Sequence, residues 1–153
     1  MTVWKFLHIA AMFAAVSIFV GQGMLSAAIA GTEDVRAIRR AATAEARFQP
    51  VGGGLFLLGI AFGFVTALTA DFDLTATWLL LGYGLAVVIL VTGIAYHGPR
   101  GKRLHDLAEA SPEDQPSEAL RAFIRVPSAR VVVVLDMLAW LAIIYVMVAK
   151  PFS

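Results

Sequence analysis

Four long apolar stretches divide the chain, and each is long enough to cross a membrane. They cover residues 4–30, 51–70, 74–96 and 131–149. A helix needs about 20 apolar residues to span a hydrocarbon core of about 30 Å. Irregular backbone cannot face lipid, because its polar groups would be unpaired there. We therefore predict an all-α protein in which four transmembrane helices pack as an antiparallel bundle, with residues 1–153 forming a single membrane domain.

The composition supports this prediction. Of the 153 residues, 59% are hydrophobic and only 15% are charged, whereas soluble domains carry about 25% charged residues. The chain has no cysteine, which excludes disulfides, thiolate metal sites and thiol catalysis. The first stretch carries one flanking lysine, Lys5, and no small-residue cleavage site, so we expect a retained span rather than a cleaved signal peptide.

The basic residues are distributed unevenly between the connections. The segments 31–50 and 97–130 hold ten of the 12 Lys and Arg residues, and only Lys5 and Lys150 lie elsewhere. Because basic loops stay in the cytoplasm, we predict that both of these segments are cytoplasmic and that both termini lie outside. The predicted location is the bacterial inner (plasma) membrane, with several passes.

The two basic loops contain signals for helix ends. Thr32 is a candidate N-cap, so we expect the first span to continue past Gly31 as a bent cytoplasmic helix. Residues 97–99 (His-Gly-Pro) predict the end of the third helix. A short helix over residues 118–125 has one apolar face and is expected at the level of the lipid headgroups. Neither loop contains a phosphate-binding loop or a nucleic-acid module, so the expected partner is the lipid bilayer.

Small residues recur at helical spacing in three spans. Membrane helices pack through such surfaces because small residues let two backbones approach closely. The stripes would serve internal packing or a homodimer or other membrane-protein partner equally well. Their members are Ala10, Ala14, Ser17 and Gly21; Gly52, Gly59, Gly63 and Ala67; and Gly82, Ala86 and Gly93.

Asp136 is the most costly residue in the chain. It lies six positions after Arg130, or about 9 Å of helix rise, and an aspartate near a helix centre costs about 2.5–3.5 kcal/mol on insertion scales. Such a carboxylate should face the bundle interior and have a partner. Gln22 and Thr92 are the groups within reach at its depth, and an arginine that extends inward from the cytoplasmic surface is the alternative partner. Asp136 would then be a polar staple, a group for proton or ion movement, or a contact for a cofactor or partner.

His8 is the second polar residue that requires an explanation. It is either an interfacial anchor or an axial ligand to a haem iron held between helices, since neutral imidazole is the usual axial ligand. His97 is interpreted as an interfacial residue at a helix end. The antiparallel arrangement places His8 and His97 on opposite sides of the membrane, so they cannot hold one metal or one haem together.

The residues Trp4-Lys5-Phe6-Leu7-His8-Ile9, the four spans, and a third span from Trp78 to Tyr96-His97 resemble a superfamily of small bacterial membrane proteins. It includes membrane-type protoporphyrinogen oxidase (HemJ-like), CopD-like copper-resistance proteins and a four-helix integral membrane family of unknown function, which is the most similar. The resemblance implies haem b bound through His8. The lysine that the oxidase has four residues after its third-span tryptophan is Gly82 here, and its first-span arginine is missing from residues 21–25, which argues against the oxidase activity.

Two functional hypotheses result. The first is a non-enzymatic membrane protein that binds haem b through His8 or serves as an accessory subunit of a membrane complex. The second is a small proton-coupled carrier or transporter that uses Asp136. No flavin, nucleotide or metal motif is present in the sequence, so an enzyme is the less favoured class.

Overall fold

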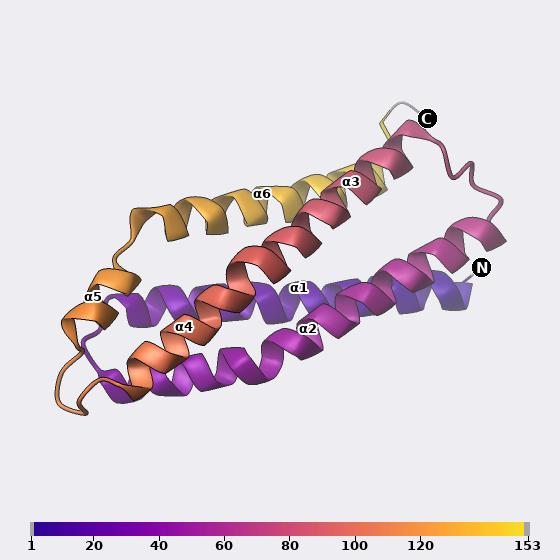
Figure 1. Ribbon diagram of the computed structural model, residues 1–153. Coiled ribbons are helices and arrows are strands. Elements are labelled where there is room, and N and C mark those ends of the chain that lie inside the picture. The colour runs from indigo at the N-terminus through magenta and orange to yellow at the C-terminus, as the bar shows by residue number, and fades with distance from the viewer. Residues whose placement is uncertain (1, 152–153) are drawn as a thin grey trace.

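The computed structural model describes residues 2–151, and all of its regular structure in that range is helical (Figure 1). The four helical segments within residues 3–29, 35–69, 77–109 and 118–149 are long and apolar enough to cross a membrane. The predicted fold, an all-α membrane protein with four spanning helices, is confirmed. The elements in order are α1 Thr2–Ala30, α2 Val35–Thr69, α3 Thr77–Thr92, the π-helical turn η1 Gly93–His97, α4 Gly98–Glu109, α5 Glu118–Ile124 and α6 Pro127–Ala149.

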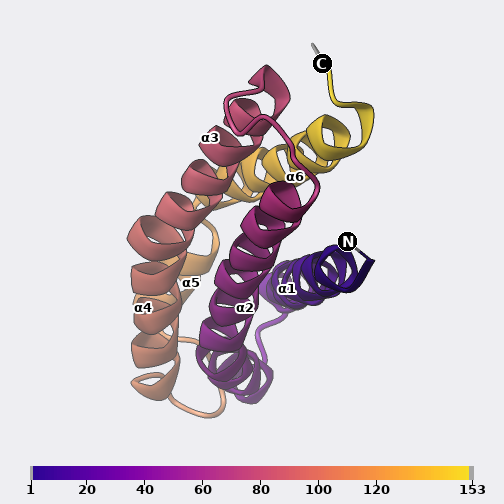
Figure 2. The same cartoon turned by 90° about the vertical axis from the view of Figure 1, so that its right-hand side faces the viewer.

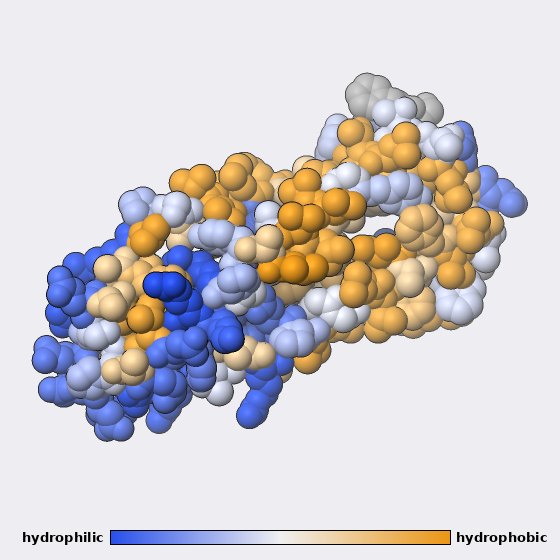
Figure 3. All heavy atoms as spheres, viewed as in Figure 1, coloured by the Kyte–Doolittle hydropathy of each residue, from blue (hydrophilic) through white to orange (hydrophobic). Residues whose placement is uncertain are grey.

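The two ends of the bundle differ in character. The chain ends and the 70–76 connection lie at one end, which we call the terminal end (Figure 1). The 31–34 link, α4 and α5 lie at the other, which we call the basic end. On the face shown in Figure 3, hydrophilic side chains gather at the basic end and apolar ones cover most of the rest. The N-out, C-out topology stays a prediction from this charge distribution.

The four spanning helices form two pairs. α1 packs along α2, and α3 packs against α6, whereas few close contacts join α1 to α6. Seen from the terminal end, α1 and the α3–α4 helix lie on opposite sides of α2 (Figure 2). The pairs meet mid-bundle through Trp140 of α6, whose ring centroid lies 5.2 Å from that of Phe56 and 6.1 Å from that of Phe19. A slit separates the pairs towards the terminal end (Figure 3).

The basic end has a hydrophobic cluster of its own. Its buried members are Ile29, Ile38, Ala41, Ala108 and Leu120, contributed by α1, α2, α4 and α5. Apolar burial stabilises this packing independently of the lipid, because these side chains are removed from water. The helices outside the predicted spans therefore form a folded cap on the bundle.

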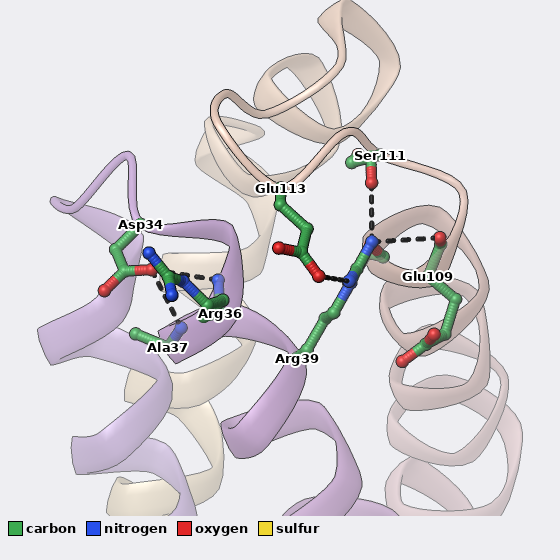
Figure 4. A network of polar contacts seen from close by, with 8 residues as sticks. Asp34, Arg36, Ala37, Arg39, Glu109, Ser111 and Glu113 are labelled. Carbon is green, nitrogen blue, oxygen red and sulfur yellow. Dashed lines mark hydrogen bonds and ion pairs between the residues drawn. The ribbon is translucent and has the colours of Figure 1, made fainter.

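Arg39 of α2 ties α4 to this cap (Figure 4). Its Nε donates to the carbonyl of Ala108 at 2.9 Å, and its Nη2 donates to the carbonyls of Ser111 at 2.6 Å and Glu109 at 3.2 Å. These carbonyls lie in the last turn of α4 or just after it, where a helix leaves its acceptors unpaired. One guanidinium thus satisfies the C-terminal end of α4.

The cytoplasmic helix predicted after the first span belongs to α2 instead. The chain leaves α1 at Gly31, and Asp34 is the N-cap that begins α2, accepting from the backbone N–H groups of Arg36 and Ala37. Thr32, the predicted cap, donates its hydroxyl to the carbonyl of Ile29. α2 then runs without interruption through Pro50 to Thr69. The prediction of a bent extension of the first span is wrong, because Asp34 provides the stronger cap.

The predicted helix end at residues 97–99 is also wrong. The third span continues through η1 into α4 as far as Glu109. The predicted short helix is confirmed as α5, capped by the hydroxyl of Ser117, which accepts from the N–H of Leu120. Leu120 is fully buried in the cap, so the apolar face of α5 packs on protein at that position.

Only some of the small residues in the predicted stripes pack against another helix. A Cβ added at Gly52, Gly59 or Gly63 of α2 would lie within about 3 Å of side chains from α1, so this stripe is a packing surface. Gly82 of α3 lies against the methyl group of Met147. On α1 the buried small residues are Ala11 and Ala15. Ser17 and Gly21 of the predicted stripe on α1 are exposed.

Candidate functional site

Polar groups from all four spanning helical segments converge towards the basic end of the bundle. We call Gln22, Glu45, His97 and Asp136 the polar cluster. Its centre is a hydrogen bond between Nε2 of His97 and Oδ2 of Asp136, with the two atoms 2.5 Å apart. The His97 side chain is 30% exposed and the Asp136 side chain 18% exposed. This short contact joins the third span to the fourth and gives the intramembrane carboxylate a partner.

The π-helical turn η1 determines where His97 points. In this turn the N–H of Gly98 donates to the carbonyl of Gly93, five residues earlier. One additional residue in a turn rotates the following helix by about 100° relative to an uninterrupted α-helix. Pro99, which has no N–H to donate, follows directly. Turns of this kind are frequent at functional sites, and here His97 is the last residue of the turn.

Tyr96 packs beside His97 within the same turn. The two rings meet edge to face, with their centroids 5.2 Å apart. The Tyr96 hydroxyl is buried and has no hydrogen-bond partner among residues 2–151. Its ring therefore covers one side of the His97 imidazole.

Glu45 of α2 places a second carboxyl near His97. Burial raises the pKa of the Glu45 carboxyl above its ordinary value of 4.5, and the charges of His97 and Arg100 oppose part of this increase in the pKa. The amide of Gln22 on α1 donates to the backbone carbonyl of Glu45 at 3.4 Å. Glu45 lies in the part of α2 that precedes the predicted span 51–70. The sequence prediction missed it, because one glutamate among charged neighbours on a cytoplasmic helix gives no signal of burial.

The predicted partners of Asp136 have other hydrogen bonds. Gln22 bonds to α2 through the Glu45 carbonyl. The hydroxyl of Thr92 donates back to the carbonyls of Val88 and Ile89 in its own helix. Within residues 2–151, Asp136 is hydrogen-bonded to His97 rather than to Gln22 or Thr92. The sequence analysis assigned His97 to the interface, because it predicted the helix to end there.

His8 lies in a notch between α1 and α2, roughly 20 Å along α2 from Glu45, given 14 residues between Glu45 and Gly59. Its Nδ1 lies 2.7 Å from the carbonyl oxygen of Gly59. Because a carbonyl only accepts, Nδ1 carries the proton and Nε2 is left with a free lone pair. A Cβ at Gly63 would lie 2.9 Å from Nδ1, so the absence of a side chain there makes room for the ring.

The proton position on the His8 ring is the one that a histidine ligand to one face of a haem iron would have. A histidine whose Nδ1–H bonds to a carbonyl is oriented to ligate through Nε2. No group of three or more His, Asp or Glu side chains in the described part of the chain is arranged to hold a bare metal ion. Met147, on the opposite helix pair, is packed onto Gly82. The hydrogen bond to Gly59 therefore leaves one imidazole nitrogen of His8 available as a ligand, and haem binding stays a prediction.

Comparison of the chain with protein-family models, with curated proteins and with solved structures finds no match. The resemblance to the CopD-like and protoporphyrinogen-oxidase-like proteins stays a prediction from the sequence.

Proposed function

We propose that the protein is a proton-coupled carrier of the bacterial inner (plasma) membrane in which the His97–Asp136 pair holds the coupling proton. The single observation that supports this proposal is the 2.5 Å contact between Nε2 of His97 and Oδ2 of Asp136 inside the bundle. Intramembrane carboxylates are rare, and they mark proton and ion pathways in pumps and transporters. Histidine is the side chain whose charge changes most readily near neutral pH.

The net charge of the pair depends on the shared proton. With neutral His97 and ionised Asp136 the pair carries one negative charge. The hydrogen bond places the proton of neutral His97 on Nε2, so an additional proton binds at Nδ1 or at Oδ2 and makes the pair neutral overall. Placing an uncompensated charge in a low-dielectric region is costly, so protonation changes which arrangement of the helices is favoured. A carrier needs such a difference in order to couple proton binding to a change of conformation.

The two helix pairs provide surfaces that can move relative to each other. They meet mid-bundle through the rings of Trp140, Phe56 and Phe19, and they are separated by a slit towards the terminal end (Figure 3). Because His97 and Asp136 both belong to the α3–α6 pair, the proton site would move with that pair. Glu45 and Gln22 belong to the α1–α2 pair and face it at the basic end.

Proteoliposomes with an internal pH-sensitive dye test this proposal. Solutes are added by class: amino acids, sugars, organic cations and inorganic cations. The expected result is an internal pH change with one class in the wild type and none in Asp136→Asn. Asp106→Asn, a change at an exposed position of α4, serves as the matched control and should retain the response. An equal response in Asp136→Asn, or no response to any class, contradicts the proposal.

A second candidate function is the binding of haem b through His8, either in this chain alone or as an accessory subunit of a membrane complex. It is favoured by the Nδ1 hydrogen bond to Gly59, which leaves Nε2 free. A bound haem would supply electron-transfer chemistry, and His8 would hold its iron from one side. The test is the absorption spectrum of the purified protein after incubation with haem. A Soret band that disappears in His8→Ala and persists in His105→Ala supports it, whereas an unchanged spectrum in His8→Ala contradicts it.

A further inference from the structure

We infer that Glu45 is the group through which protons pass between the solvent at the basic end and the His97–Asp136 pair. This inference rests on the proposed function, because it assigns the access route to the same proton site. It adds a carboxyl from the other helix pair, α1–α2. Glu45 lies against the α3–α4 helix, at Gly101.

Gly101 of α4 makes room for the Glu45 carboxyl. A Cβ at Gly101 would lie 3.0 Å from Oε1 of Glu45 and 3.8 Å from Oε1 of Gln49, one turn further along α2. A side chain at position 101 would require the Glu45 carboxyl to shift by a few tenths of an ångström, whereas its distance to Gln49 is an ordinary contact. The carboxyl of Glu45 therefore rests directly on the backbone of the α3–α4 helix.

Gly101 in turn is one helical turn from His97. Residues four positions apart lie on the same face of a helix, about 5–6 Å from each other. The Glu45 carboxyl is thus positioned about one turn from the imidazole, a gap that one or two water molecules can bridge by hydrogen bonds. Glu45 is only half-buried, so it also has access to solvent.

The charged and titratable groups around Glu45 are consistent with this role. His97 of η1 and Arg100 of α4 act on the carboxyl by charge, and both oppose the increase in its pKa that burial causes. α6 contributes Asp136 behind His97. α1 contributes the uncharged amide of Gln22, which fixes the backbone of Glu45. A carboxyl whose pKa is raised by burial is able to take up and release a proton closer to neutral pH.

The transfer moves protons only, and no other bond is made or broken. Protonated Glu45 gives its proton, through water, to Nδ1 of His97, the ring nitrogen that is not bonded to Asp136. The proton on Nε2 then passes to Oδ2 of Asp136 along their hydrogen bond. Glu45 becomes a carboxylate, Asp136 becomes a carboxylic acid, and the imidazole is again neutral in its other tautomer. The reverse sequence releases the proton.

The test measures the titration of Glu45 in the full-length protein in nanodiscs, by carbon-13 NMR of labelled glutamate carboxyls. Glu45→Gln identifies the signal among the five glutamates. His97→Gln should move the titration midpoint of Glu45 to higher pH, because the charge of His97 opposes the increase that burial causes in the pKa of Glu45. The control His105→Gln, the same change in α4, should leave it in place. Thermal melts establish that each variant is folded.

A second measurement follows delivery of the proton. After a rapid drop in pH on the basic side, labelled Asp136 should be protonated in a fast phase that is lost in Glu45→Gln and restored in Glu45→Asp. A Glu45 midpoint that His97→Gln leaves unchanged, or an unchanged fast phase in Glu45→Gln, overturns the inference. Failure of the proposed function is detected by a different experiment: the proteoliposome response to solutes would then be unaltered in Asp136→Asn.

Discussion

Nε2 of His97 and Oδ2 of Asp136 lie 2.5 Å apart, although 39 positions separate the two residues along the chain. The contact joins the π-helical end of the third span to the fourth span. It gives the most costly residue of the membrane-spanning region its partner. The predictions below follow from this pair and from the packing that positions it.

The hydrogen bond between His97 and Asp136 should appear as a coupling free energy. A double-mutant cycle with His97→Gln and Asp136→Asn, followed by unfolding in detergent, should give a coupling of about 1–3 kcal/mol, as for residues of one hydrogen-bonded network. The matched cycle with Thr92→Ala and Asp136→Asn should give a value near zero, because Thr92 bonds within its own helix. Equal coupling in both cycles would contradict the assignment of the partner.

The stability of the protein should depend on pH through Glu45. Burial raises the folded-state pKa of Glu45 above 4.5, so the folded state binds more protons than the unfolded state between 4.5 and that raised pKa. Stability contributed by this group is therefore lost as pH rises through that window. Glu45→Gln should be more stable than the wild type at neutral pH and equally stable below pH 4.5. Melting temperatures measured across this range check the sign, and Glu109→Gln, at an exposed position, should track the wild type.

Trp140 should be the residue that holds the two helix pairs together. Its side chain is 8% exposed and contacts the rings of Phe56 and Phe19. Truncation of a buried tryptophan costs about 3–5 kcal/mol, so Trp140→Ala should lower the free energy of unfolding by an amount in that range. Leu141→Ala, a neighbour that is 62% exposed on the outside of the bundle, should cost much less. Similar losses for both variants would contradict the central role of Trp140.

The notch that holds His8 should tolerate no side chain at Gly63. A Cβ there would lie 2.9 Å from Nδ1 of His8, so Gly63→Ala should displace the ring and break its hydrogen bond to Gly59. Proton NMR of the His8 ring N–H measures this directly. Gly54→Ala is the control, since nothing lies within 4 Å of its Cβ position, and it should leave the His8 signal unchanged. A His8 signal that is the same in Gly63→Ala and wild type would contradict the notch.

The membrane fold could be predicted from the sequence because each apolar stretch is long. Each span repeats the same apolar requirement over about 20 residues, so single exceptions do not hide it. The helix boundaries at the basic end depend on single residues instead. Asp34 rather than Thr32 caps α2, and a π turn before Pro99 lets the third helix continue where a Gly-Pro pair predicts a stop.

The candidate site was predicted in part for the same reason. Asp136 was identified because a charged residue in an apolar run is conspicuous. Its partner His97 was missed because His97 faces α6 only as a consequence of the π-helical turn η1. Nothing in the sequence around His97 or Asp136 predicts that turn. Glu45 was missed because its burial depends on the glycine at position 101 of another helix.

The central claim is that His97 and Asp136 share one exchangeable proton. The most direct test is isotope-edited infrared spectroscopy of the labelled imidazole and carboxyl groups in nanodiscs while the pH is varied. We predict that the His97 and Asp136 bands change together, and that Asp136→Asn shifts the His97 band because their hydrogen bond is lost. Bands that change independently, with a His97 band unchanged by Asp136→Asn in a folded protein, would contradict the claim.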